Sequence, residues 1–358
     1  MSTQPSALLA EGIEPVAAPK ESPGAKARRL LSFRNISALY ILAAIVLYFS
    51  WKIPGTFLAA GTWRTLLDNQ VITGMAALAL LVPLAAGVFN LAIGLQVGAG
   101  SILCGWMLVN AGLSIPMTVV ATCLSGIVIG LVSAFLIVQI RIDSFIATLG
   151  VSSLLAAFIT AISGGEQILG VPDEFSDFGV ANVGGITYSF IALIVVAFIV
   201  WYLLERTPSG RRVYATGGNI DAARLAGVDT TAVIYGSLAA CGLLAALAGV
   251  MLTARLGNAD PTIGPGYLVP AFTAAFLGST QFKGGRFNVW GTIVSAYVLA
   301  VGVKGLQLSG APLWIPDAFN GVSLLVAVGL AKYQSGDLWR LTRRTLRLDR
   351  PTGGADPV

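Results

Sequence analysis

Apolar runs of about 20 residues recur along the chain, and they restrict its fold more than any other feature of the sequence. A helical run of that length can cross a hydrocarbon layer roughly 30 Å thick. Backbone polar groups in lipid must be satisfied within the segment itself, so the runs should be helices. A β-barrel would need alternating strands of about ten residues, and the sequence lacks that pattern. We therefore expect an all-α, polytopic integral membrane protein.

Composition supports the same fold class and argues against an enzyme. Hydrophobic residues make up 56% of the chain and charged residues 11%, whereas soluble domains carry about 25% charged residues. Histidine is absent, and the three cysteines lie in apolar runs without metal-ligand spacing. No lysine follows a glycine, so a Walker A phosphate loop is missing from the sequence. We expect no catalytic constellation, no metal and no cofactor in this chain.

Ten candidate spans follow from the apolar runs. The first, eighth and tenth are short for a straight crossing, which favours tilted, broken or re-entrant helices at those places. The uncharged stretch 70–138 leaves open whether Arg34 and Arg141 are separated by four crossings or by two crossings and a re-entrant pair. The expected spans are 36–50, 70–89, 92–111, 115–138, 145–163, 187–204, 232–252, 268–279, 287–307 and 318–331.

Charge placement predicts the orientation and the outer boundaries of the membrane domain. Most of the 22 lysines and arginines fall in segments that the ten-span scheme places inside, as the positive-inside rule requires. Both termini should therefore be cytoplasmic, and no nucleic-acid partner is needed to explain the net charge of +5. We expect a disordered tail at 1–33, a transmembrane domain at 34–332, and a basic tail at 333–358 that lies against anionic lipid.

Polar residues inside the spans suggest where a solute could pass. Asn90 and Gln96 lie in a glycine-rich interruption, where amides can bind a neutral polar solute or cap backbone groups freed by a broken helix. Thr148 can face the same pathway or bond the carbonyl one turn back. Lys304 is the one clear ionisable residue in a span, near its outer end, where it can snorkel. This scarcity of charge argues against a proton- or sodium-coupled carrier.

The longest cytoplasmic loop, 205–231, carries the strongest functional signal. Gly217 and Gly218 are expected to form a turn, and Asn219 is a good N-cap for a short helix. Gly227 should end that helix. A short surface helix with small side chains suits docking into a groove of a partner protein. The residues assigned to this role are Gly218, Asn219, Asp221, Ala222, Ala223 and Gly227.

Several motifs in the chain resemble one family of transport proteins. The stretch Gly218-Asn219-x-x-Ala222-Ala223-x-x-x-Gly227 is similar to the cytoplasmic coupling loop of ABC importer permeases of the ribose/xylose/galactose type. Upstream, Thr207-x-x-Gly210-Arg211 matches that family's Thr-x-x-Gly-Arg. Asn90-Leu91-Ala92-Ile93-Gly94 stands where many members have Asp-Leu-Ser-Val-Gly, so the aspartate is missing here. Together with glycine patterns near 278 and 291, the matches extend over residues 36–331.

The resemblance implies a function and a set of partners. It implies a permease subunit in a bacterial inner membrane that translocates a monosaccharide by alternating access. Two ATPase subunits, a periplasmic sugar-binding protein and a second permease copy or paralogue would complete the importer, with ATP bound by the partners. Branched-chain amino acids, whose permeases are related, or another small polar solute are the alternative solutes. A secondary carrier and a membrane enzyme are the remaining alternatives.

Overall fold

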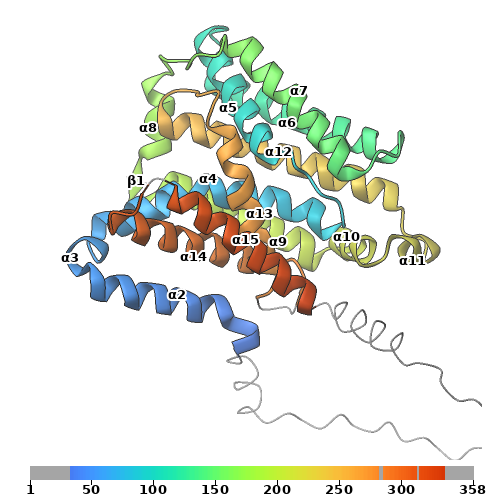
Figure 1. Cartoon of the computed structure of the whole chain (residues 1–358). Coiled ribbons are helices and arrows are strands. Elements are labelled where there is room, and N and C mark those ends of the chain that lie inside the picture. The colour runs from blue at the N-terminus through green and yellow to red at the C-terminus, as the bar shows by residue number, and fades with distance from the viewer. Residues whose placement is uncertain (1–32, 282–284, 313, 335–358) are drawn as a thin grey trace, which may run out of the picture.

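Each of the ten expected spans coincides with a helix in the computed structural model, which describes residues 33–281, 285–312 and 314–334 (Figure 1). The predicted tails, 1–33 and 333–358, lie outside the described residues except at their innermost positions. The helices at the expected spans are α2 Phe33–Lys52, α4 Ala60–Ala85, α5 Ile93–Val109, α6 Ile115–Val138, α7 Ser144–Ser163, α9 Tyr188–Arg206, α12 Thr230–Leu256, α13 Leu268–Ser279, α14 Val289–Leu308 and α15 Ile315–Gln334.

The helices differ in whether they can cross a membrane unaided. Among the described residues, six are long and apolar enough by themselves, namely α4, α6, α7, α9, α12 and α14. The apolar parts of α2, α5 and α15 are shorter, and α13 has only 12 residues. The all-α polytopic fold is therefore confirmed, and the short apolar helices are those of the first, eighth and tenth spans, as expected, and also that of the third span.

The remaining elements are short and connect the long helices. Two lie at one end of the bundle, α3 Pro54–Phe57 and α8 Asp173–Val180, together with a hairpin of β1 Asn182–Val183 and β2 Ile186–Thr187 (Figure 1). At the opposite end lie α10 Pro208–Gly218 and α11 Ile220–Leu225. A 3-10 turn, η1 Gly264–Tyr267, precedes α13.

The uncharged region 70–138 is resolved into three helices. After α4 ends, residues 86–92 form no regular helix, and α5 begins only at Ile93. Gly87 lies against Gly217 at the α10 end of the bundle, whereas Gly105 packs against Ala259 near the α8 end. The segment 86–109 therefore runs from one end of the bundle to the other, and four long helices, α2, α4, α5 and α6, lie between the start of α2 at Arg34 and Arg141.

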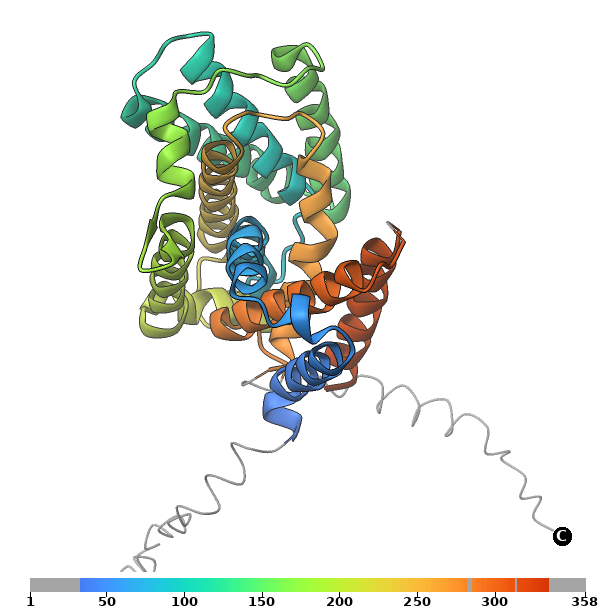
Figure 2. The ribbon, with the colours of Figure 1, turned by 90° about the vertical axis from the view of Figure 1, so that its left-hand side faces the viewer.

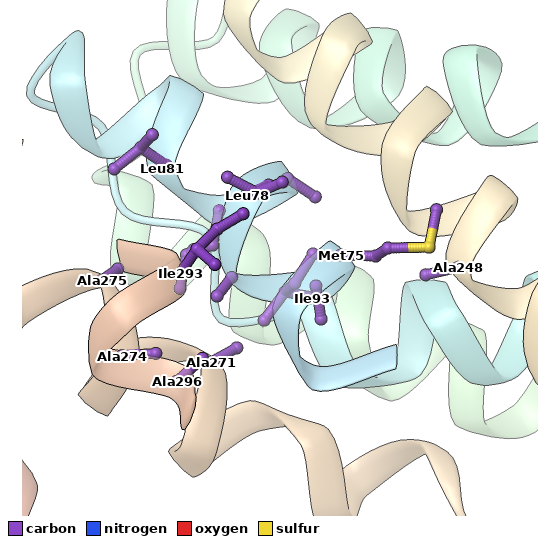
Figure 3. Packing of buried hydrophobic residues seen from close by; sticks show 14 of the residues in the cluster. Met75, Leu78, Leu81, Ile93, Ala248, Ala271, Ala274, Ala275, Ile293 and Ala296 are labelled. Carbon is purple, nitrogen blue, oxygen red and sulfur yellow. The ribbon is translucent and has the colours of Figure 1, made fainter. Parts of the chain in front are cut away.

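Helix α4 lies at the centre of the bundle when the molecule is viewed from the α3 and α8 end (Figure 2). It contacts α9, α12, α13 and α14, and all of its residues from Val71 to Ala85 are buried. Met75 points from α4 toward Ala248 on α12, and Ile293 of α14 lies beside the α13 alanines (Figure 3). Small side chains at these crossings allow the helices to approach closely, as is common in membrane proteins.

Glycines allow a close helix crossing between α6 and α12. A Cβ atom added at Gly126 would collide with the carbonyl oxygen of Gly242, and one at Gly130 with that of Leu238. The Gly126-x-x-x-Gly130 pattern is therefore a packing face, because no larger side chain fits between the two backbones. The crossing joins α12, the longest helix described, to α6. Through α6, it packs α12 against the half of the bundle that also contains α5 and α7.

Candidate functional site

The coupling segment 205–231 begins with a helix that the sequence does not predict. Thr207 accepts a hydrogen bond from the backbone N–H of Gly210, and Pro208 follows in the first helical turn. Both features start helices. The resulting α10 extends to Gly218, so Gly217 and Gly218 are its last residues, and the expected turn at these glycines is wrong.

The second helix of the segment, α11, has the predicted caps. Asn219 ends α10 and accepts a hydrogen bond of 2.9 Å from the backbone N–H of Ala222 through its Oδ1 atom. Asp221 lies in the first turn, where the helix dipole favours a carboxylate. Gly227 has a φ of +82°, a left-handed conformation that strains other residues. Local sequence signals thus fix the position of this helix.

The outward face of α11 differs from the expected one. Ala222 is exposed, but Ala223 is only 5% exposed and packs inward, so the expectation of two surface alanines is half wrong. The outward residue that the sequence reading overlooks is Leu225, which is 90% exposed, with Ile220 39% exposed on the same helix. A large aliphatic side chain held in water on a short ordered helix is a typical feature of a docking surface.

The coupling segment is fastened to the bundle at two places. A Cβ atom at Gly217 would collide with the carbonyl oxygen of Ala85, so α10 lies directly on the end of α4. The Tyr214 hydroxyl donates a 2.8 Å hydrogen bond to the carbonyl oxygen of Phe287, just before α14. The Arg286 guanidinium lies 3.5 Å from the centroid of the Tyr214 ring, and desolvation raises the pKa of this phenol. Helix α10 therefore contacts both the end of α4 and the segment that precedes the first turn of α14.

The start of α14 is held by one side chain. Asn288 donates from Nδ2 to the carbonyl oxygens of Gly278 and Gln281, at 3.0 and 2.9 Å. Its Oδ1 atom accepts a 2.7 Å hydrogen bond from the backbone N–H of Gly291. The glycine pattern near 278 and 291 thus marks a tight junction in which one amide joins the end of α13 to the first turn of α14.

Asn90, Gln96 and Thr148, predicted on the solute pathway, meet at the break before α5. The Asn90 Nδ2 atom donates to Gln96 Oε1 at 2.9 Å, and Asn90 Oδ1 accepts from the backbone N–H of Ala92 at 3.0 Å. Thr148 Oγ1 accepts from the backbone N–H of Leu91 at 3.1 Å and donates to the carbonyl oxygen of Ser144. The three side chains therefore surround and cap the irregular segment 86–92.

Burial separates these three residues from solvent in this conformation. Asn90 and Thr148 are 0% exposed and Gln96 is 2% exposed. The Gln96 Nε2 atom has no hydrogen-bond partner among the described residues, which makes it the one unused donor of the cluster. The geometry favours a structural role for Asn90, because its amide is fully engaged with neighbouring groups. Of these two amides, we propose only Gln96 as a contact for the solute in its pathway.

Comparisons with known proteins place this architecture in a family. Residues 65–328 match the family model described as the permease component of branched-chain amino acid transport systems. The autoinducer 2 import system permease protein LsrD of Salmonella typhimurium is 30% identical over 267 residues, which cover 73% of this chain and 80% of that protein. LsrD of Escherichia coli K12 is 29% identical over the same share of this chain and 81% of its own length. No solved structure matches the chain.

The family match begins in the first turns of α4, at residue 65, and ends within α15, at residue 328. It therefore includes the coupling segment, the junction before α5 and the core around α4. The relatives align over most of their own length. The chain therefore belongs to the permease-component family of branched-chain amino acid transport systems, as a sugar-type ABC importer permease.

Proposed function

We propose that this chain forms the solute pathway of an ABC importer and is driven through α11 by separate ATPase subunits. The observation that carries the proposal is the outward Leu225 on a capped helix, with α10 beside it fastened to α4 and α14. ATP hydrolysis by the partners would displace α11, and the two fastenings would pass that displacement into the bundle. Alternating access to a central pathway follows, with no ATP site required in this chain.

The proposed solute is a small sugar-like molecule, such as a pentose or hexose. The relatives are named for import of autoinducer 2, and the spans contain uncharged polar groups suited to a neutral solute. A zwitterionic amino acid would favour more charged anchoring groups in the spans than this chain has. Branched-chain amino acids, for which the matching family is named, are therefore the second candidate.

The proposed assembly follows from the surfaces at the two ends of the bundle. The end with α10 and α11 would face the cytoplasm and the ATPases, which is consistent with its arginines and with the positive-inside rule. The opposite end carries exposed apolar residues on loops, including Leu169 and Trp314, and would receive a periplasmic solute-binding protein. A second permease copy or paralogue would complete the pathway in the bacterial inner membrane, with both termini of this chain cytoplasmic.

Replacement of Leu225 tests the proposal directly. Leu225→Glu removes an apolar anchor without burying a charge inside this chain, because the side chain is already in water. Loss of one such anchor from an interface costs about 1–3 kcal/mol, so we expect at least a fivefold loss of ATPase that co-purifies with the permease. Leu169→Glu is the matched control, since Leu169 is also an exposed leucine, 65% accessible, but at the opposite end.

The readouts are ATPase co-purification in detergent and ATP-dependent uptake of labelled D-ribose, D-xylose, D-galactose and L-leucine in proteoliposomes with the binding protein. The Leu169→Glu variant should retain the ATPase. Wild-type recovery of the ATPase by Leu225→Glu would refute the docking role of α11. Uptake of leucine and of none of the sugars would replace the proposed solute by the second candidate.

A further inference from the structure

A polar cavity lies between α4, α13, α14 and α15, in the half of the bundle away from the coupling segment. Its volume is about 240 Å³, just below the range of roughly 300–1,000 Å³ that holds most small-molecule ligands. Leu66, Pro270 and Leu299 supply part of an apolar wall. Ala300 and Val303 complete the apolar part of the lining, and its polar part consists of Asn69, Gln70 and Thr73 from α4, Lys304 and Gln307 from α14, and Asn320 from α15.

Most of these polar groups have no hydrogen-bond partner among the described residues. Arg255 engages Asn69, by a 3.1 Å hydrogen bond to its Oδ1 atom. The side chains of Gln70, Thr73, Lys304, Gln307 and Asn320 form no hydrogen bond or ion pair within the part of the chain that the structure describes. Thr73 is only 7% exposed, and it lines the cavity without a hydrogen-bond partner among the described residues. Thr73 is the buried one of these five and the other four are partly or largely exposed, so the cavity wall offers several hydrogen-bonding groups that a ligand can reach.

The charge of the cavity restricts that ligand. Lys304 provides one fixed positive charge, and no carboxylate lines the cavity among the described residues. Lys304, expected to snorkel, thus contributes to a concave site. A cation would be repelled there, whereas a neutral polyhydroxylated molecule can accept from the ammonium and exchange hydrogen bonds with the amides. An anionic molecule would in addition be attracted by the positive charge of Lys304.

We propose that this cavity is the entry site of the transported solute, and that it accepts small polyhydroxylated solutes that are neutral or anionic and rejects cations. The proposal rests on the proposed import function and identifies where and by which groups the solute is bound. The cavity is bordered by α4 and α14, the same two helices to which the coupling segment is fastened at their other ends. Movement of α10 would therefore change its width.

Cysteine labelling tests the cavity without knowledge of the solute. The assembled importer carrying Asn320→Cys is treated in proteoliposomes with an anionic reagent, 2-sulfonatoethyl methanethiosulfonate, and with its cationic 2-trimethylammonioethyl counterpart. Each reagent forms a disulfide with the thiolate and releases methanesulfinate. We expect Asn320→Cys to react with both, and Lys304→Gln to lower the anionic-to-cationic rate ratio by about three- to tenfold.

Two controls define the background of the labelling. The native chain should remain unlabelled, because Cys104 and Cys241 are buried and Cys123 is half-buried on a membrane-spanning helix. Val128→Cys places an accessible thiol on the apolar face of α6, where Val128 is 57% exposed. It should resist both charged reagents if that face lies in lipid, since the reagents cannot enter hydrocarbon and a thiolate does not form there.

Uptake connects the cavity to transport. The probe is whichever of D-ribose, D-xylose and D-galactose the Asn320→Cys importer accumulates, and reaction with the anionic reagent should reduce that uptake at least tenfold. Absence of labelling, an unchanged charge preference in Lys304→Gln, or full uptake after complete labelling would each overturn the entry-site proposal. Failure of the import function itself would appear differently, as ATP-independent or absent uptake of every probe before any reagent is added.

Discussion

The two ends of α4 are built in opposite ways. At one end, Ala85 is covered by Gly217 of α10, and the following break is closed by Asn90, whose amide is fully hydrogen-bonded. At the other end, Gln70 and Thr73 border a polar cavity and have no partner in the described chain. At the first end the polar side chain is hydrogen-bonded to the backbone and to a neighbouring amide. At the second end the polar side chains have no hydrogen bond within the described chain.

This difference shows how a polar residue in a membrane helix can be assigned a role. An amide that satisfies a broken helix is fixed by the fold, and its removal leaves buried backbone groups unpaired. An amide or hydroxyl without a partner contributes less to the fold, and in the wall of a cavity it can bind a molecule from outside the chain. The two classes should therefore differ in the stability of their variants, and the predictions below follow that difference from the largest effect to the smallest.

Asn90→Leu should produce the largest loss of stability. The change removes the acceptor for the Ala92 N–H and the donor to Gln96 Oε1, both in a fully buried site. We expect a cost of about 2–4 kcal/mol and a lower thermal midpoint in detergent. Gln96→Leu should cost less, because it removes one acceptor together with an amide nitrogen that already lacks a partner.

The comparison between these variants also decides the pathway hypothesis for the junction. If Asn90→Leu remains as stable as the native chain and loses only uptake, Asn90 is a solute contact and its structural role is refuted. If Gln96→Leu keeps its stability and loses uptake, Gln96 is the residue of this cluster that reaches the solute.

Gly217→Val should produce the next largest effect, because the new side chain collides with the carbonyl oxygen of Ala85. Overpacking of such a contact costs about 1–3 kcal/mol, and it should also displace α10 and reduce ATPase co-purification. Gly218→Val is a close control, since a Cβ atom at Gly218 meets nothing within 4 Å. Equal thermal midpoints for the two variants would contradict the direct seating of α10 on α4.

Ala223→Leu and Ala222→Leu separate packing from docking on α11. Ala223 is buried, so a larger side chain there should destabilise the segment by about 1–2 kcal/mol. Ala222 is exposed, and its substitution should leave the thermal midpoint unchanged while lowering ATPase co-purification. Native recovery of the ATPase by Ala222→Leu would restrict the docking surface to the region around Leu225.

The sequence predicts the helices and caps well because the forces that form them are local. The apolar run 115–138 alone places α6, and the N-cap amide of Asn219 alone places α11. The sequence does not predict α10, because Gly217 and Gly218 resemble a turn when the close contact with Ala85 is unknown. The inward direction of Ala223 is hidden for the same reason, since it depends on how the segment lies on the bundle.

The polar cavity could not be predicted from the sequence for a different reason. Its lining combines residues near 70, 304 and 320, and each of them in isolation is an ordinary polar residue toward the end of an apolar run. The junction near Asn90 was easier to notice because its polar and glycine residues are adjacent in the sequence. Adjacency marks a break in a helix, whereas a ligand site is assembled from distant segments and appears only in the folded chain.

Thr73→Val should have the smallest effect on stability. The substitution keeps the shape of the side chain and removes a hydroxyl that has no hydrogen bond in the described chain, so we expect a change within about 0.5 kcal/mol. Thr253→Val is the matched comparison. Thr253 is also buried, but its Oγ1 atom lies 2.8 Å from Ser101 Oγ and 3.1 Å from the Ser101 carbonyl oxygen.

Loss of the Thr253 hydroxyl leaves the Ser101 hydroxyl unpaired between α5 and α12, at a cost of about 1–3 kcal/mol. Thermal midpoints measured side by side should therefore fall for Thr253→Val and stay constant for Thr73→Val. Uptake should show the reverse order when corrected for folded protein, because only Thr73 faces the proposed entry site, and a lost solute contact of about 1 kcal/mol lowers affinity roughly fivefold. Two variants that lose stability equally and transport equally would remove the distinction between the two ends of α4, because the unpaired hydroxyl would then serve the fold and not the solute.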